Sequence, residues 1–191
     1  IRQVRQAAGP EAAIVIIMSG AFVQRGEPAF FDKWHRAAWA IDGGADVVIE
    51  LPAVYALSSA AGFAQGGVTL AARLGCQALA CGVEGGTAAD FLPLARRSEG
   101  LTACLKAAKK SSAGQQLTDA LMAAAPDEAR LLQQPNALLA FEYARAMLKQ
   151  EQPLTFLPLP RQGRHGDTGL GAAFASASAL RQAMRCSGTA D

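Results

Sequence analysis

The stretch Ala12–Met18 reads AAIVIIM and is followed by Ser19-Gly20. A short run of β-branched residues that ends in a turn is typical of a strand buried on both faces of a parallel sheet. Similar runs lie farther along the chain, at residues 46–51, 77–81 and 154–158. The first run is also the longest unbroken apolar stretch, well short of the ~20 residues that a membrane-spanning helix needs.

Helical patterns lie between these strands. Asp32 is expected to cap a helix that Gly43-Gly44 ends, and apolar residues at i, i+4 and i+7 predict a helix over residues 57–74. Further helices are expected at residues 88–110, 115–124 and 136–150. Because strand and helix alternate, the sequence predicts an α/β fold with a parallel sheet flanked by helices. We expect residues 1–191 to form a single domain.

Composition and charge exclude several classes of protein. The 18 basic and 16 acidic residues leave a net charge of only +2, which excludes a strongly basic coat for nucleic acid but not a local patch. A hydrophobic content of 51% excludes a disordered chain. The four cysteines show no Cys-x-x-Cys spacing and the two histidines lie far from them in the sequence, so we expect neither a metal site nor a disulfide framework. Unpaired thiols fit a reducing cytoplasm.

Ligands of such folds bind beyond the carboxyl ends of the strands. The loops to consider are residues 19–31, 51–57, 82–87 and 158–178. The glycine-rich stretch at residues 81–86 lacks the dinucleotide fingerprint and the P-loop lysine. No Ser-His-Asp order or carboxylate pair stands out, so the chemistry expected here is the handling of phosphate.

Charged residues cluster around the first two strand ends. Gln24 and Arg25 lie in the first loop, where Arg25 either lines the mouth of a site or forms an internal ion pair with Glu27. Lys33 begins the next helix, and it either meets phosphate or RNA or is simply solvated. Glu50, at the end of the second strand, either binds a ligand or pairs with Arg25 as part of the structure.

The second half of the chain carries residues suited to an anion. Asn136 begins a helix, where its amide either contacts a ligand or caps the helix. Arg161 and Arg164 lie in a segment that either contacts phosphate or is a flexible surface loop. An anion site at a helix N-terminus would use Ser176, Ser178 and Arg181.

Five blocks, in this order and spacing, resemble the bacterial tRNA(Met) cytidine acetate ligase family of the nucleotidyltransferase superfamily. They are MSGAFVQRGEPAFFDKWHRAA, GADVVIELPAVYALSSAAGFAQGGV, LGCQALACGVEGG, QQPNALLAFEYARAM and FASASALRQAM. The resemblance implies a Rossmann-like nucleotidyltransferase fold. It also implies a cytoplasmic enzyme that activates acetate with ATP and Mg²⁺ to acetyl-adenylate, without attachment to a membrane. The acetyl group then passes to N4 of the wobble cytidine of elongator tRNA(Met).

The resemblance also assigns roles to residues. Gly82 would lie against the nucleotide, Asn136 would hydrogen-bond it and Arg161 would contact its phosphates. The superfamily's second phosphate-binding signature matches Ser176, Ser178 and Arg181. The candidates for contacts with tRNA or at the mouth of the site are Gln24, Arg25, Lys33 and Arg164.

The sequence departs from the family pattern in two places, and these departures change what we expect of the chain. The family's first strand and its His-x-Gly-His loop have no counterpart here, and Ala21 replaces an asparagine common among relatives. We therefore expect a piece of the catalytic domain, without the C-terminal part that helps to hold tRNA, and inactive alone. The alternatives are a nucleotidyltransferase that acts on a small metabolite and a noncatalytic nucleotide- or RNA-binding module.

Overall fold

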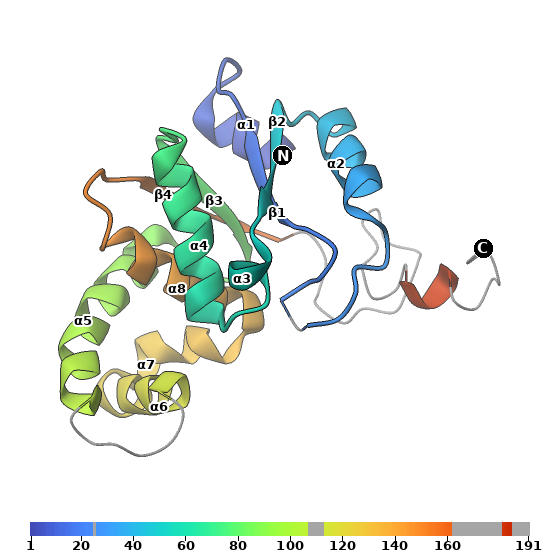
Figure 1. Cartoon of the computed structure of the whole chain (residues 1–191). Coiled ribbons are helices and arrows are strands. Elements are labelled where there is room, and N and C mark those ends of the chain that lie inside the picture. Colours follow the sequence, from blue (N-terminus) through green and yellow to red (C-terminus); the bar gives the residue numbers. More distant parts are fainter. Residues whose placement is uncertain (25, 107–112, 162–180, 185–191) are drawn as a thin grey trace. The chain divides into compact units, whose positions relative to one another are not determined.

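The computed structural model describes residues 1–24, 26–106, 113–161 and 181–184 (Figure 1). Contacts divide the chain into two compact units, Ile1–Leu159 and Pro160–Asp191. The elements in chain order are α1 (Arg2–Ala8), β1 (Val15–Ser19), α2 (Lys33–Asp42), β2 (Val47–Leu51), α3 (Ala53–Ala56), α4 (Ala60–Arg73), β3 (Ala78–Val83), α5 (Ala88–Lys106), α6 (Ala113–Ala124), α7 (Pro126–Ala129), the 3-10 helix η1 (Arg130–Gln133), α8 (Pro135–Met147) and β4 (Thr155–Pro160). The predicted α/β class is confirmed.

The strands form two pairs. β1 runs parallel to β2, in a register that sets Val15 opposite Val47 and Ser19 opposite Leu51. β3 pairs with β4, and within the described residues the two pairs do not join into one sheet. The prediction that the first strand is buried on both faces is wrong: all five residues of β1 are only half-buried. The reason is that one edge of β1 has no neighbouring strand among the described residues.

The helix limits follow local capping chemistry. The Asp32 carboxylate accepts hydrogen bonds from the backbone N–H groups of Trp34 (2.8 Å) and His35 (3.0 Å), so the predicted cap of α2 is confirmed. The helix predicted over residues 57–74 is confirmed as α4, and the short helix α3 precedes it. Ser59 starts α4 because its hydroxyl accepts a hydrogen bond from Gly62 N–H (3.3 Å).

The hydrophobic core lies where α4 and α5 pack against α8, beside β3. Phe91 of α5 and Phe141 of α8 are almost completely buried. The ring of Phe91 meets that of Phe156, from β4, edge to face at 6.1 Å between centroids. Burial of each such ring stabilises the fold by about 1.5–3 kcal/mol. None of the described helices is long and apolar enough to cross a membrane.

Candidate functional site

The first group of candidate residues lies where β1 and β2 end. Glu50 is opposite Met18 in the register, and its carboxylate lies against the bare Cα of Gly20. A Cβ at residue 20 would overlap Glu50 Oε1, so a larger residue here would have to displace the Glu50 carboxylate. Lys33 Nζ donates to Glu50 Oε2 at 2.6 Å. The structure therefore pairs Glu50 with Lys33, and neither a solvated Lys33 nor an ion pair of Glu50 with Arg25 is needed to explain these residues.

Arg36 of α2 fixes both ends of the loop that follows β1. Its guanidinium donates to the carbonyl oxygens of Ser19 (3.0 Å) and Phe31 (3.0 Å), and also to that of Gly20. One side chain thus satisfies three carbonyl groups, two at the carboxyl end of β1 and one just before α2. This arrangement holds the loop in one conformation.

The loop between these anchor points folds back on itself. Phe22 and Pro28 form an antiparallel bridge, and Val23 N–H donates to Glu27 O at 3.0 Å. Gly26 closes the turn with φ 78°, a left-handed conformation that favours glycine. Gln24 lies half-buried inside this turn. Arg25 is outside the described residues, so its predicted roles stay predictions.

The second group joins the end of β3 to the start of α8. The Glu84 carboxylate accepts hydrogen bonds from the backbone N–H groups of Asn136 (3.3 Å) and Ala137 (3.1 Å) and from the Asn136 side-chain amide. The N-cap of α8 is Gln134, whose side chain makes no capping hydrogen bond, and Pro135 follows it. The interpretation of Asn136 as the N-cap is therefore wrong, because Glu84, just after β3, accepts the hydrogen bonds at this helix end instead.

The electrostatics at this helix end favour an ionised Glu84. Partial burial alone would raise the pKa of Glu84, but the hydrogen bonds from Asn136, from its own backbone and from Ala137 outweigh burial and lower it. A negative charge at a helix N-terminus is also stabilised by the helix dipole. Gly82, two residues before Glu84, is exposed at the strand end, so a planar ligand can approach its backbone there.

The remaining predicted residues belong to the unit Pro160–Asp191. Arg161 is described and exposed, and Arg181 lies in the helical turn described at residues 181–184. Arg164, Ser176 and Ser178 lie outside the described residues. The described part of the chain brings together no three His, Cys, Asp or Glu side chains that could hold a metal ion.

Sequence reasoning missed Glu84 and Arg36. Glu84 gives no local signal, because its partner Asn136 is 52 residues away. Arg36 resembles any exposed arginine of an amphipathic helix, since the three carbonyl groups that it binds belong to other segments. The position of a carboxylate directly after a strand of an α/β fold is the signal that could have pointed toward Glu84.

Comparison with known proteins gives independent evidence on the family of this chain. The family model described as "HIGH Nucleotidyl Transferase" matches residues 1–191. The chain is 39% identical to the tRNA(Met) cytidine acetate ligase of Syntrophomonas wolfei subsp. wolfei, over 92% of this chain and 45% of that protein. It is also 39% identical to the protein of the same name from Latilactobacillus sakei subsp. sakei, over 96% of this chain and 47% of that protein. The chain thus spans about half the length of the curated relatives it matches.

Two solved structures are similar to the whole fold. Thermotoga maritima TmcAL in its apo form I superposes with a TM-score of 0.85 at 30% identity, over 97% of this chain and 47% of that one. The same protein bound with alpha-thio ATP gives a TM-score of 0.81 at 30% identity, over 96% of this chain and 45% of that one. The resemblance drawn from the five sequence blocks, and the nucleotidyltransferase fold that it implies, are confirmed.

Proposed function

Since the chain belongs to the HIGH nucleotidyl transferase family, we propose that residues 1–191 form the ATP-binding catalytic domain of a cytoplasmic tRNA(Met) cytidine acetate ligase. The complete enzyme activates acetate with ATP and transfers the acetyl group to N4 of the wobble cytidine of elongator tRNA(Met). The observation that carries this proposal is the similarity, over 96% of the chain, to a structure bound with an ATP analogue.

The geometry at the strand ends is consistent with a nucleotide site. Gly82 offers exposed backbone, and Asn136 lies in the first turn of α8 directly beside Glu84. We assign contact with the nucleotide to Gly82 and Asn136. We assign contact with its phosphates to Arg161, Ser176, Ser178 and Arg181. Glu84 touches Asn136 and acts as its positioning residue, because it fixes the direction of that amide.

The proposed reaction has two steps, activation of acetate and transfer of the acetyl group. An acetate oxygen attacks the α-phosphorus of ATP, the new P–O bond forms and the bond to the β-phosphate oxygen breaks, so pyrophosphate leaves with the electron pair. The cytidine amine then attacks the acetyl carbon, AMP leaves and the amine loses a proton. Neither step needs a protein nucleophile, and the arginines stabilise charge that develops on the phosphoryl oxygens.

Mg²⁺ belongs to the proposal as a companion of ATP. Mg²⁺ is usually held by one or two carboxylates together with substrate phosphates. Because the described residues offer no cluster of three candidate ligands, no protein cage for the ion is assigned and no step is routed through it. The side chains proposed for RNA or for the mouth of the site are Gln24, Arg25, Lys33 and Arg164.

ATP–pyrophosphate exchange by the complete gene product, with and without acetate, tests the proposal. Exchange that depends on acetate is expected, because acetyl-adenylate formation is reversible. Exchange without acetate would favour a nucleotidyltransferase that acts on a metabolite, and ATP binding without any exchange would favour a noncatalytic module.

A matched pair of variants ties the activity to the site. Asn136→Ala is expected to lower exchange at subsaturating ATP by at least about tenfold. The reason is that the variant loses the hydrogen bond that we assign between Asn136 and the bound nucleotide. Glu128→Gln is the control, since Glu128 forms a surface ion pair with Arg97 at 3.1 Å. Equal activities of the two variants would remove Asn136 from the site.

A further inference from the structure

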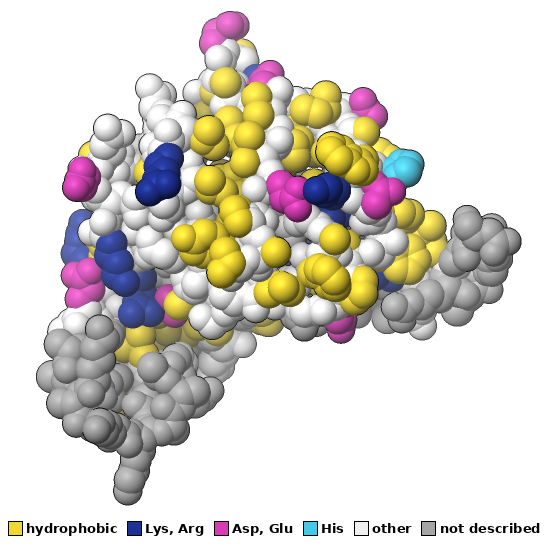
Figure 2. Space-filling model, viewed as in Figure 1, with side chains coloured by type: hydrophobic (Ala, Val, Ile, Leu, Met, Phe, Trp, Pro, Cys, Tyr) yellow, Lys and Arg dark blue, Asp and Glu magenta, His cyan; other side chains and the backbone are white. Residues whose placement is uncertain are grey.

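An exposed ion pair and an exposed indole ring lie side by side where β1 and β2 end. Lys33 Nζ is 2.6 Å from Glu50 Oε2 and 5.2 Å from the centre of the Trp34 ring. In Figure 2, acidic, basic and hydrophobic side chains meet near the start of α2. The three side chains therefore form one group at the carboxyl end of this strand pair, where ligands of α/β folds bind.

The Trp34 ring is left open by the fold. It is 74% exposed, although tryptophan side chains are mostly buried in folded proteins. Trp39, on the same helix, instead packs edge to face against Phe31 at 4.8 Å between ring centres. The exposure of Trp34 shows that the nearby Lys33 ammonium covers little of its ring. An open aromatic face is the kind of surface on which unpaired bases of RNA stack.

One oxygen of the Glu50 carboxylate is available to a ligand. Oε2 accepts a hydrogen bond from Lys33, whereas Oε1 lies beside the bare Cα of Gly20 and accepts none from the described residues. The Glu50 side chain is 47% exposed, so a ligand can reach it. An ionised carboxylate accepts hydrogen bonds and donates none, and it therefore selects a ligand edge that carries N–H groups.

The ring and the carboxylate together select among the bases of RNA. Cytosine carries the amino group N4, whose hydrogens a glutamate accepts, whereas uracil and guanine carry a carbonyl oxygen at the corresponding place. That oxygen would face the carboxylate with no hydrogen between them. Adenine also carries an amino group, but we assign the adenine nucleotide to Gly82 and Asn136, at the end of β3 and the start of α8.

We propose that Trp34, Lys33 and Glu50 form the subsite that receives the acceptor cytosine. The base stacks on the Trp34 ring, its N4 amino group donates to Glu50 Oε1, and Lys33 is the positioning residue that holds the carboxylate. This inference rests on the proposed function, which names cytidine as the acceptor. A base that reacts must leave the stack of its own strand, and in this subsite the indole ring replaces the stacking that the base has lost.

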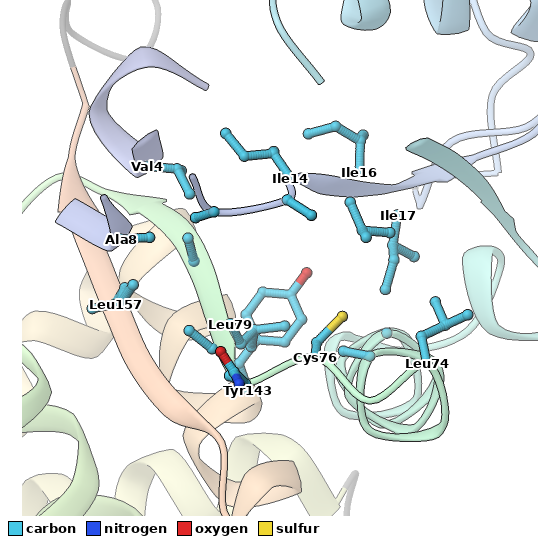
Figure 3. A pocket seen from close by; sticks show the side chains of 18 of the residues that line it. Val4, Ala8, Ile14, Ile16, Ile17, Leu74, Cys76, Leu79, Tyr143 and Leu157 are labelled. Carbon is cyan, nitrogen blue, oxygen red and sulfur yellow. The ribbon is translucent and has the colours of Figure 1, made fainter. Parts of the chain in front are cut away.

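The apolar cavity of the chain is unsuited to this task. It has a volume of about 480 Å³, and Figure 3 shows Ile14 and Ile17 on one side of it and Leu79 and Tyr143 on the other. None of the described residues that line it is charged. A wall without a carboxylate gives no acceptor of the kind that distinguishes cytosine from uracil, so the exposed group at the strand ends is the better site for the base.

Acetyl transfer by the complete gene product tests the ring. Trp34→Leu removes the flat surface but keeps an apolar side chain, so we expect the KM for tRNA(Met) to rise by at least about fivefold. Trp34→Phe keeps a flat ring and should restore most of the affinity, and Trp39→Leu is the matched control that should leave this KM unchanged. ATP–pyrophosphate exchange uses no RNA, so in Trp34→Leu the loss in transfer should exceed any loss in exchange by at least about fivefold.

A tRNA(Met) with uridine in place of the wobble cytidine tests the carboxylate. Filter binding gives the dissociation constants of both RNAs, and we expect the wild-type enzyme to bind the uridine form at least about tenfold more weakly. In Glu50→Ala this ratio should fall by at least about fivefold, because the acceptor for N4 is lost. Glu128→Ala removes a carboxylate from a distant surface ion pair and should retain the ratio of the wild type.

The results also separate this inference from the proposed function. Equal KM values for Trp34→Leu and Trp39→Leu would overturn the subsite, and so would an unchanged ratio in Glu50→Ala. A wild-type enzyme without acetate-dependent exchange would refute the proposed function and this inference with it. Normal exchange and transfer by the wild type, together with normal values in these variants, would refute the subsite alone.

Discussion

The hydrogen bonds between Glu84 and the start of α8 give the sharpest prediction about stability. In Glu84→Ala, the backbone N–H groups of Asn136 and Ala137 and the Asn136 amide lose their acceptor. Loss of a capping side chain lowers the free energy of unfolding by about 0.5–2 kcal/mol. Loss of the negative charge at the helix N-terminus removes about 0.3–1 kcal/mol more. We therefore expect a total loss of about 1–3 kcal/mol, or about 2–4 °C in Tm for each kcal/mol.

Urea unfolding of the chain, followed by circular dichroism, measures this loss. Glu128→Ala is the matched control, because Glu128 also forms an ion pair with a distant residue but is 57% exposed. Its loss is expected to stay below about 1 kcal/mol. If Glu84→Ala is no more destabilising than Glu128→Ala, the cap contributes nothing and the reasoning is refuted.

The pH dependence of stability, measured with Glu84→Gln, gives a second check on the charge of Glu84. The folded chain lowers the pKa of Glu84 below its ordinary value of 4.5, so its contribution to stability is complete above pH 4.5. The contribution is lost as the pH falls below 4.5 and through the folded-state pKa. The difference in stability between the chain and Glu84→Gln is therefore expected to be constant near neutral pH and to shrink in acid. A difference that grows in acid would contradict the assignment.

The other predictions concern the first loop and the phosphates. Gly20→Ala is expected to displace the Glu50 carboxylate from Lys33 and, because both side chains are partly exposed, to lower the free energy of unfolding by no more than about 1 kcal/mol in urea melts, whereas Gly100→Ala, with open space around it, should raise it by up to about 1 kcal/mol. Arg36→Met should open the loop, measured as at least about tenfold faster cleavage between residues 20 and 31 in limited proteolysis; an unchanged rate would contradict the anchoring role. Arg161→Ala should weaken ATP binding, measured by calorimetry on the complete gene product, by roughly 1–3 kcal/mol, and an unchanged affinity would remove Arg161 from the site.

Local chemistry was enough to predict the position of β1 and the start of α2 from the sequence. The β-branched run at Ala12–Met18 gave the position of β1, and Asp32 capped α2 through N–H groups only two and three residues away. Signals of this kind depend on neighbours within one turn, so they can be read without the fold. The family was also readable from the sequence, because its blocks keep their residues and their spacing.

Only the tertiary structure decided how the strand ends are joined. Lys33 meets Glu50 from 17 residues away, and Glu84 meets the start of α8 from 52 residues away. Neither pairing has a local signal, because each depends on where the chain returns after a helix. The division of the strands into two pairs likewise has no local signal in the sequence. A strand's composition predicts burial but does not say which neighbour provides it, and the residues of β1 are only half-buried in the part of the chain that the structure describes.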